Sequence, residues 1–270
     1  MKGKPLSLEH KRYLKGLNRS KHRIIASQII LLIVLVAAWQ ASTDLGLVDS
    51  FITSSPKNVA QTFWKLLADD RLLYHAAVTV LETMYGFVVG TLAGTFAAML
   101  LWWFPVAAKV LDPYLVVLNA LPKIALGPLI LVLAGMGIRS ILIMTLAISL
   151  ISTIITVYSG FVQTDEEKIT LLRSFGATKS QLLFKVILPG SYENILSALK
   201  INIGLSWVGV IMGEFLVSKA GIGYLIMYGS QVFNLNLVMT GIIALSIEAA
   251  LMYYLVNIAV SQIRKLFFRG

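Results

Sequence analysis

Long apolar runs constrain this chain more than any other feature of its sequence. Six of them follow one another, each close to the roughly 20 residues that an α-helix needs to cross the hydrocarbon core of a bilayer. Backbone polar groups inside a bilayer must be paired within the protein, so runs of this length indicate helices. We therefore predict an all-α membrane protein with six transmembrane helices, at about Ile24–Gln40, Ala76–Phe104, Tyr114–Ala134, Ile138–Phe161, Ile195–Val217 and Leu235–Ile263.

Composition agrees and narrows the function classes. Apolar residues make up 57% of the chain and charged residues only 13%, against roughly 25% charged residues in ordinary soluble domains. The chain has no cysteine, which excludes disulfides and thiolate metal sites, and its three histidines do not favour a histidine-based metal centre. We expect no bound metal. Membrane topology accounts for the net charge of +10, so we expect no nucleic-acid partner either.

The distribution of lysine and arginine predicts the orientation in the membrane. Eight of these residues lie between Lys2 and Arg23, and others cluster after the fourth run and after the sixth. Such residues accumulate on the cytoplasmic side of membrane proteins. We therefore place both termini in the cytoplasm. This gives a flexible basic segment at 1–23, a transmembrane domain at 24–263 and a cytoplasmic tail at 264–270.

A polar segment of helical pattern, Thr164–Gly190, separates the fourth and fifth runs, on the cytoplasmic side in this orientation. Thr164 with Glu167 has the spacing of a capping box, which predicts a helix from Asp165. Gly176 suits the left-handed residue that ends many helices. A second capping box, Thr178 with Gln181, predicts a second helix, and we expect Pro189–Gly190 to end it.

The first of these two helices carries an apolar ridge formed by Leu171, Leu172 and Phe175. Two interpretations fit an amphipathic helix of this kind. It either rests on the lipid surface or inserts its apolar face into a groove of a soluble partner.

The same segment resembles the cytoplasmic EAA loop of the permease subunits of binding-protein-dependent ABC importers. That pattern is Glu-Ala-Ala, three residues, Gly, nine residues, then Ile-x-Leu-Pro. Gly176 takes the place of its glycine, Val186 that of its isoleucine, and Leu188–Pro189 that of its Leu-Pro. The triplet differs, because Thr170, Leu171 and Leu172 stand where Glu-Ala-Ala is expected.

The resemblance extends over about residues 50–265. The run LPKIALGPL at 121–129 looks like the broken third span of nitrate/sulfonate/taurine-type permeases. The sequences GEFL at 213–216 and SKAGIGYL at 218–225 look like the exit of the fifth span in the same group. Together these motifs identify the chain as a member of that family, which implies a type I, MetI-like permease fold of six transmembrane helices with a coupling-helix loop.

Membership implies a permease subunit in the bacterial plasma (inner) membrane. Two permease copies would form the path, two separate ATPase subunits would use ATP and Mg, and an extracytoplasmic binding protein would deliver solute. The chain itself would bind no cofactor and catalyse no reaction. The implied solute is a sulfonate-, taurine- or nitrate-like anion, or alternatively a vitamin precursor or another small organic nutrient. The residues assigned to ATPase coupling are Asp165, Glu166, Glu167, Leu171, Leu172, Arg173, Ser174, Phe175, Gly176, Ala177, Leu188 and Pro189.

The residues themselves argue against other function classes. No G-x-x-x-x-G-K-[ST] phosphate loop is present, so the chain lacks the usual ATPase motif. A secondary transporter would be expected to show broken helices in corresponding halves, and only the third run is clearly broken. An intramembrane enzyme would need convergent catalytic groups, and the runs contain no Ser/His or paired-Asp arrangement.

Polar and small residues inside the runs suggest packing and path positions. Gly86, Gly90 and Gly94 form a stripe that lets helices approach closely, within the subunit or between two permeases. Glu82 lies one turn earlier on the same face and should point into the bundle. Prolines at 122 and 128 predict a broken third span.

Several polar residues are candidates for the translocation path or gate, each with an alternative. Asn119 and Lys123 either line the path or serve at a subunit contact or the membrane surface. Glu214 either lines an outer gate or pairs with Lys219. Glu248 lies in the middle of the sixth run and should face water or a partner. The candidates are Glu82, Asn119, Pro122, Lys123, Glu214 and Glu248. Outside the runs, Ser55–Pro56 predicts the start of a helix on the outer face.

Overall fold

The computed structural model describes residues 8–267, and it divides the chain into two compact units, 1–62 and 63–270. The first unit contains α1 (Leu8–Asp44), α2 (Ser50–Thr53) and the start of α3 (Pro56–Ala68). The apolar part of α1 is His22–Asp44. In the basic segment predicted at 1–23, residues 8–23 are helical, and residues 1–7 lie outside the described part. Ser55 caps α3, as predicted: its Oγ accepts the N–H of Asn58 at 3.2 Å.

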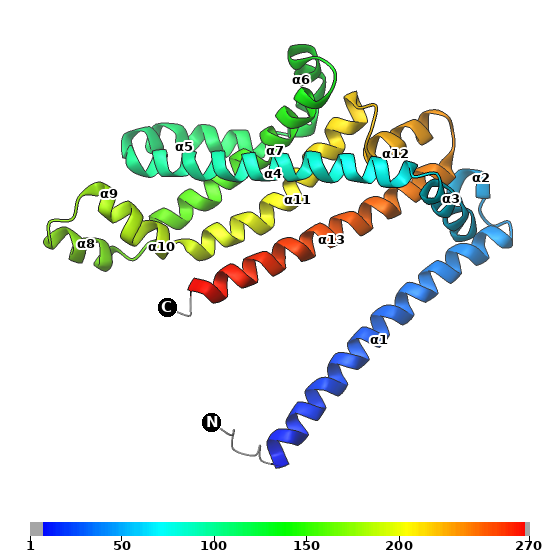
Figure 1. Ribbon diagram of the computed structural model, residues 1–270, viewed down its shortest axis with the longest axis horizontal. Helices are drawn as coiled ribbons and strands as arrows, with labels where there is room; N and C mark the ends of the chain where they lie inside the picture. The colour runs from blue at the N-terminus through cyan, green and yellow to red at the C-terminus, as the bar shows by residue number, and fades with distance from the viewer. Residues whose placement is uncertain (1–7, 268–270) are drawn as a thin grey trace. The chain divides into compact units, whose positions relative to one another are not determined.

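The second unit is a bundle in which α4, α7 and α11 pack directly against one another (Figure 1). Two further helices, α12 and α13, pack together beside α11. Five helices in the described part of the chain, α1 included, are long and apolar enough to cross a membrane, and a bent pair brings the number to six. The bounds in this unit are α4 (Arg71–Trp103), α5 (Pro105–Ala120), α6 (Gly127–Ala134), α7 (Ile138–Val162), α11 (Tyr192–Val217), α12 (Ile222–Gln231) and α13 (Leu235–Phe267).

The bent pair is the predicted third span. It consists of α5 and the Lys123–Ala134 stretch, which meet at 89°. The stretch begins with a short 3₁₀ helix, η1 (Lys123–Leu126). The predicted break is confirmed at Pro122. It is wrong at Pro128, which occupies the first turn of α6, where a missing N–H costs little. The predicted start at Tyr114 is late, because α5 runs from Pro105 straight through Pro113.

The glycine stripe of α4 faces α7. A Cβ atom placed on Gly86 would lie 2.5 Å from Thr145 Cγ2, and one on Gly94 would lie 2.7 Å from Thr153 Cβ. At Gly90 the nearest atom would be Ser149 Oγ, at 2.7 Å. All three glycines are therefore sites of close helix contact within the subunit. This packing brings α4 and α7 together as one layer against which α11 rests.

Candidate functional site

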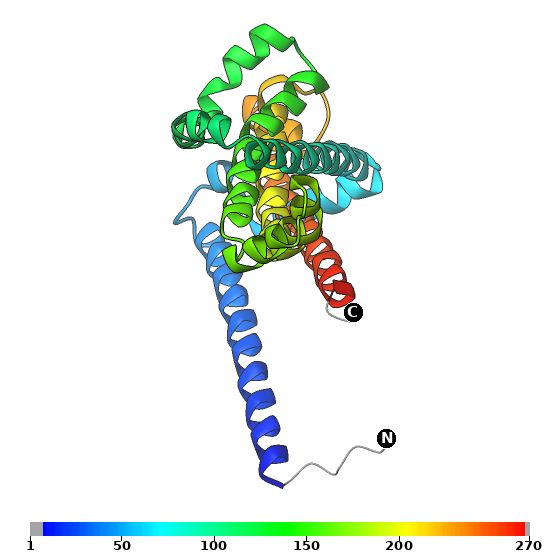
Figure 2. The same ribbon diagram turned by 90° about the vertical axis from the view of Figure 1, so that its left-hand side faces the viewer.

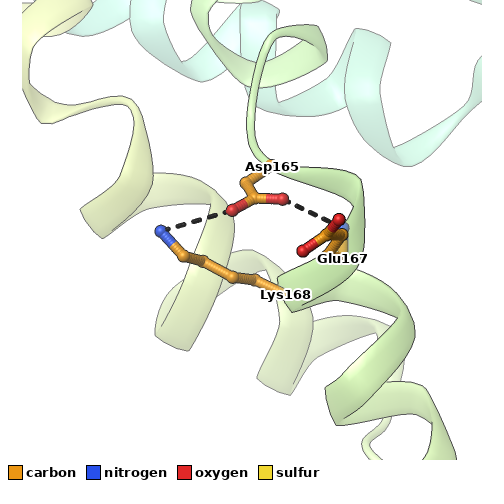
Figure 3. Close-up of polar contacts among 3 residues, drawn as sticks. All are labelled: Asp165, Glu167 and Lys168. Carbon is orange, nitrogen blue, oxygen red and sulfur yellow. Dashed lines mark hydrogen bonds and ion pairs between the residues drawn. The ribbon is translucent and has the colours of Figure 1, made fainter.

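The polar segment between α7 and α11 begins with a well-capped helix, α8 (Glu166–Ser174). The N-cap is Asp165, whose Oδ1 accepts the N–H of Glu167 at 3.0 Å and whose Oδ2 lies 3.6 Å from Lys168 Nζ (Figure 3). The predicted Thr164 cap is wrong. The Thr164 hydroxyl instead donates to the carbonyl of Gly160 at 3.3 Å, so it extends the bonding of α7. Asp165 takes over the cap, and the helix starts one residue later than predicted.

The end of α8 is built as predicted around Gly176, which has φ +77°. The Gly176 N–H donates to the carbonyl of Arg173 at 2.9 Å, and the Ala177 N–H to that of Leu172 at 3.1 Å. These two bonds form a Schellman motif, which satisfies carbonyls at the helix end. The capping box that follows is also confirmed, because Thr178 and Gln181 bond each other's backbone N–H.

The second helix of the segment consists of three parts: α9 (Lys179–Leu182), the π-helix η2 (Leu183–Ile187) and α10 (Leu188–Gly190). The helix ends at Gly190, as predicted, although Pro189 itself does not interrupt it. The Leu188 N–H bonds the carbonyl of Leu183, five residues back, just before Pro189, which has no N–H to offer. This wider turn lets the helical path pass the proline. Ser191, not Pro189, separates the segment from α11.

The two halves of the segment differ in how firmly the bundle holds them. Leu183 and Ile187 of η2 are buried in a core cluster with residues of α4, α7 and α11. Lys179 Nζ donates to the carbonyl of Trp103 at 2.5 Å. By contrast, Leu171 on α8 is 56% exposed, and Phe175, the residue that follows α8, is 80% exposed. Figures 1 and 2 show this segment at the end of the bundle opposite α12.

The predicted apolar ridge is therefore only partly free. Leu171 and Phe175 are exposed, whereas Leu172 is half-buried. Two exposed apolar side chains on a polar helix, fixed at both ends by local hydrogen bonds, make a surface suited to a groove in another protein. Exposed residues of both charges surround them, with Glu166 and Glu167 in the first turn and Arg173 in the last.

The candidates of the bent span lie together at its break. Lys123 Nζ donates to Asn119 Oδ1 at 3.1 Å, across the residues that include Pro122. Asn119 and Pro122 are exposed and Lys123 is half-buried. Glu248 lies apart from them on α13. Its Oε2 is buried and has no hydrogen-bond partner among the described residues.

Glu82 and Glu214 are brought together in the interior of the bundle, and both are buried. The predicted alternative of a Glu214–Lys219 pair is wrong. Oε1 of Glu214 accepts the hydroxyl of Thr79 at 2.7 Å, and Oε2 accepts the N–H of Gly223 at 2.6 Å. Sequence reasoning missed Thr79 and Gly223 as partners. The only local signal was the Gly-x-Gly sequence at 221–223, where α12 begins.

An ion pair near the other end of α11 was also missed. Glu193 Oε1 lies 2.6 Å from Arg264 Nη2, and the Tyr192 hydroxyl donates to Glu193 Oε1 at 2.7 Å. The pair joins the start of α11 to the end of α13, one turn beyond the polar segment.

Comparisons with known proteins identify the family to which the chain belongs. Residues 90–270 match the family model described as "Binding-protein-dependent transport system inner membrane component". A probable ABC transporter permease protein of Haemophilus influenzae is 29% identical over 225 residues, which cover 83% of this chain and 91% of that protein.

Two further relatives carry more specific names. The putative aliphatic sulfonates transport permease protein SsuC of Bacillus subtilis is 28% identical, over 83% of this chain and 81% of its own length. The taurine transport system permease protein TauC of Escherichia coli is 25% identical, over 85% of this chain and 86% of its own length.

The fold also has a match among solved structures. A chain of the MetNI methionine ABC transporter, in an inward-facing conformation, superposes with a TM-score of 0.59 at 20% sequence identity. The match covers 70% of this chain and 92% of that one. At this identity the likeness establishes the fold, which is the MetI-like arrangement expected from the sequence.

Proposed function

The chain belongs to the family of binding-protein-dependent transport system inner membrane components, and we propose that it works as the permease subunit of an ABC importer in the following way. Two copies of the chain form the path. Two separate ATPase subunits bind at the cytoplasmic face, and an extracytoplasmic binding protein delivers the solute. Both termini lie in the cytoplasm. The subunit binds no cofactor and catalyses no reaction, since the partner ATPases use the ATP and Mg.

The observation that carries this proposal is the exposed Leu171–Phe175 ridge on α8. Burying Leu171 and Phe175 in a groove of the ATPase would remove exposed apolar surface from water at about 25 cal/mol per Å². The capped ends of α8 keep the ridge in a fixed shape, which lowers the entropic cost of docking. Threonine and two leucines at 170–172 replace the expected Glu-Ala-Ala, so the contact relies on apolar surface.

The path from α8 into the membrane is short and firmly packed. α9, η2 and α10 lead directly into α11, and Leu183 and Ile187 tie them to the core. When ATP binding closes the ATPase pair, the two α8 helices move toward each other. The packed segment transmits this motion to α11, and the two permeases switch between outward- and inward-facing states.

We propose a small sulfonate- or taurine-like anion as the solute. The names of the two relatives above support it, and so does Lys123, whose ammonium lies at the break of the bent span with Asn119. Glu82 and Glu214 are buried within the subunit, so Lys123 and Asn119 are the better candidates for the path. A vitamin precursor is the alternative. The two solute classes are distinguished by adding taurine or riboflavin as a competitor during ATP-driven uptake in proteoliposomes. Inhibition by taurine favours the anion, and inhibition by riboflavin favours the alternative.

Docking is tested by cross-linking single cysteines, which is straightforward because the chain has no cysteine. We choose Ser174→Cys on α8 and Ser230→Cys on α12 as a matched pair. Both serines are exposed, and their helices, α8 and α12, lie at opposite ends of the bundle (Figure 1). With the cognate ATPase present, we expect Ser174→Cys to cross-link to it, with a yield that changes at least about threefold on ATP addition. Ser230→Cys should not cross-link.

Uptake driven by ATP is measured on the same samples before oxidation, so that each variant is known to assemble. Intact uptake without any cross-link at position 174 would refute docking through α8. Equal cross-linking at both positions would also refute it, because the contact would then not distinguish the two ends of the bundle.

A further inference from the structure

α11 and α13 pack side by side (Figure 1), and an apolar groove follows their contact. The groove has two adjoining parts, of about 390 and 530 Å³, which share Leu199 on α11 and Ile263 on α13. The larger part extends to α4, where Val80, Met84 and Phe87 line it. Every residue that lines this larger part is apolar. Such a lining suits a hydrocarbon ligand rather than a polar solute, which would lose its hydrogen bonds to water there.

The groove has the length of one lipid leaflet. On α13 the lining of its larger part extends from Met252 to Ile263. At about 1.5 Å per residue this stretch is about 17 Å long, and half of the hydrocarbon core of a bilayer is roughly 15 Å thick. The stretch belongs to the second half of α13. The groove therefore lies in the leaflet that contains the C-terminal end of this helix.

Polar groups gather at the end of the groove where α11 begins and α13 ends. Tyr192 lines the smaller part of the groove there, and its hydroxyl donates to Glu193 Oε1 at 2.7 Å. Arg264 directly follows Ile263, and its Nη2 lies 2.6 Å from the same oxygen. Tyrosine and arginine at the end of an apolar stretch are typical of the depth at which lipid headgroups lie.

The charge at this end of the groove is positive. Lys265 follows Arg264 in the last turn of α13, and Lys200 lies about two turns after Glu193 on the same face of α11. Three cationic side chains thus accompany one carboxylate. The ion pair engages Nη2 of Arg264, and the guanidinium carries further N–H donors on Nη1 and Nε, in a geometry that matches a phosphate. The carboxylate holds this guanidinium at the end of the groove.

We propose that the groove binds an anionic phospholipid, with an acyl chain between α11 and α13 and the phosphate at Arg264 and Lys200. Basic pockets between transmembrane helices on the cytoplasmic side are typical of sites for anionic headgroups. The cytoplasmic position of this site rests on the orientation proposed above, whereas the binding itself does not. A free phosphate would leave the apolar groove unfilled. A second copy of the chain is the other occupant to be tested.

Native mass spectrometry of the full chain in detergent measures the binding of single lipids. The probes are dioleoyl phosphatidylglycerol and dioleoyl phosphatidylcholine, which share their acyl chains and differ in net charge. We expect the wild type to bind phosphatidylglycerol at least about fivefold more tightly, which is the effect of one cationic side chain near an anionic lipid. An excess of inorganic phosphate should not displace it. Equal affinities for the two lipids, or displacement by inorganic phosphate, would overturn the proposal.

Two substitutions break the same ion pair and should have opposite effects on lipid binding. Arg264→Gln removes a cation, so the preference for phosphatidylglycerol should fall by about fivefold. Glu193→Gln removes the nearby negative charge and leaves the cations in place, so the preference should be unchanged or larger. An equal loss of preference in both variants would mean that the pair only joins the two helices, and that Arg264 does not bind the phosphate.

Bulk added to the groove tests the place of the acyl chain. Ala259 lines the larger part of the groove and is exposed, so Ala259→Trp fills the groove without entering the core. Ala250 is also exposed and lies about two and a half turns earlier, on the opposite face of α13, so Ala250→Trp is the matched control. We expect Ala259→Trp to weaken the binding of both lipids at least about fivefold, and Ala250→Trp to change it by less than about twofold.

Unchanged lipid binding by Ala259→Trp would refute the site in the groove. If the same variant also changed from dimer to monomer, the groove would be a contact between two copies of the chain. The mass of each species reports both outcomes in one spectrum. None of these measurements involves the ATPase or transport, so a negative result would leave the proposed function intact.

Discussion

Single glycines decide how closely α4 approaches α7. Gly86, Gly90 and Gly94 recur every four residues, and they meet Thr145, Ser149 and Thr153, which recur with the same spacing. Thr145 and Thr153 each donate to a carbonyl four residues earlier in α7. Their hydroxyls therefore do not need α4 for a partner, and the contact between the helices rests on close packing of small groups.

This contact predicts the effect of adding one methyl group. Gly86→Ala would place a Cβ 2.5 Å from Thr145 Cγ2, and overpacking of this kind costs about 1–3 kcal/mol. Gly204→Ala is the control, because nothing lies within 4 Å of a Cβ there. We expect Gly86→Ala to lower the apparent melting temperature and Gly204→Ala to leave it unchanged or raise it slightly.

A second substitution tests whether the Thr145 methyl is the cause. Thr145→Ser removes Cγ2 and leaves Cβ, which would lie 3.3 Å from the new methyl group. The double variant Gly86→Ala/Thr145→Ser should regain most of the lost stability. A double variant no more stable than Gly86→Ala would show that the strain lies elsewhere.

At the level of single elements, much of the secondary structure of the α8–α9 segment could be predicted from the sequence, because its signals are local. Caps and left-handed glycines act on residues two to five positions away, so Gly176 and the Thr178–Gln181 box could be read directly. The outcome of competition between neighbouring caps could not be predicted in this way. Thr164 and Asp165 both suit the N-cap position, and in the structure Asp165 occupies it. The π-helix before Pro189 likewise has no simple sequence signature.

Gly176 has a left-handed backbone conformation at the end of α8. Its φ of +77° costs an ordinary L-residue about 1–2 kcal/mol. This cost is smaller for Asn than for most other residues. Since nothing lies within 4 Å of a Cβ at this position, the cost is one of backbone strain alone. We expect ATP-driven uptake to fall in the order Gly, Asn, Val, with membrane insertion unchanged. Equal uptake by Gly176→Val and wild type would mean that the turn does not need this conformation.

At the scale of the whole molecule, sequence reasoning found the membrane spans and missed what joins them. Hydropathy depends only on the residues of one continuous segment, so the membrane spans could be predicted from the runs of apolar residues. Thr79 and Glu214 are 135 residues apart, and nothing in either neighbourhood indicates the other. The same holds for Glu193 and Arg264. The Thr79–Glu214 hydrogen bond and the α11–α13 ion pair form between residues that are distant in sequence, so they depend on the packing of the helices.

The contacts among α4, α7 and α11 are too close to change during transport. The glycine stripe holds α4 on α7, and Gly209 and Gly213 of α11 lie against the backbone of Thr145 and Ile141 on α7. A Cβ on Gly209 would come within 2.5 Å of the Cα of Thr145. Helices this close cannot slide without losing their contacts, because packed interfaces are not continuously deformable. We therefore expect α4, α7 and α11 to move as one body during transport.

A disulfide between α4 and α7 tests this expectation. Cβ atoms at 86 and 145 would lie 3.3 Å apart, close to the roughly 3.5–4.5 Å of natural disulfides. With no native cysteine, Gly86→Cys/Thr145→Cys forms one defined bond, and each single variant is its control. Because the two helices do not separate in a rigid unit, oxidised and reduced protein should take up solute at rates within about twofold of each other. Uptake lost on oxidation and restored by reduction would show instead that α4 and α7 part in the cycle, and the moving boundary would then lie inside the subunit.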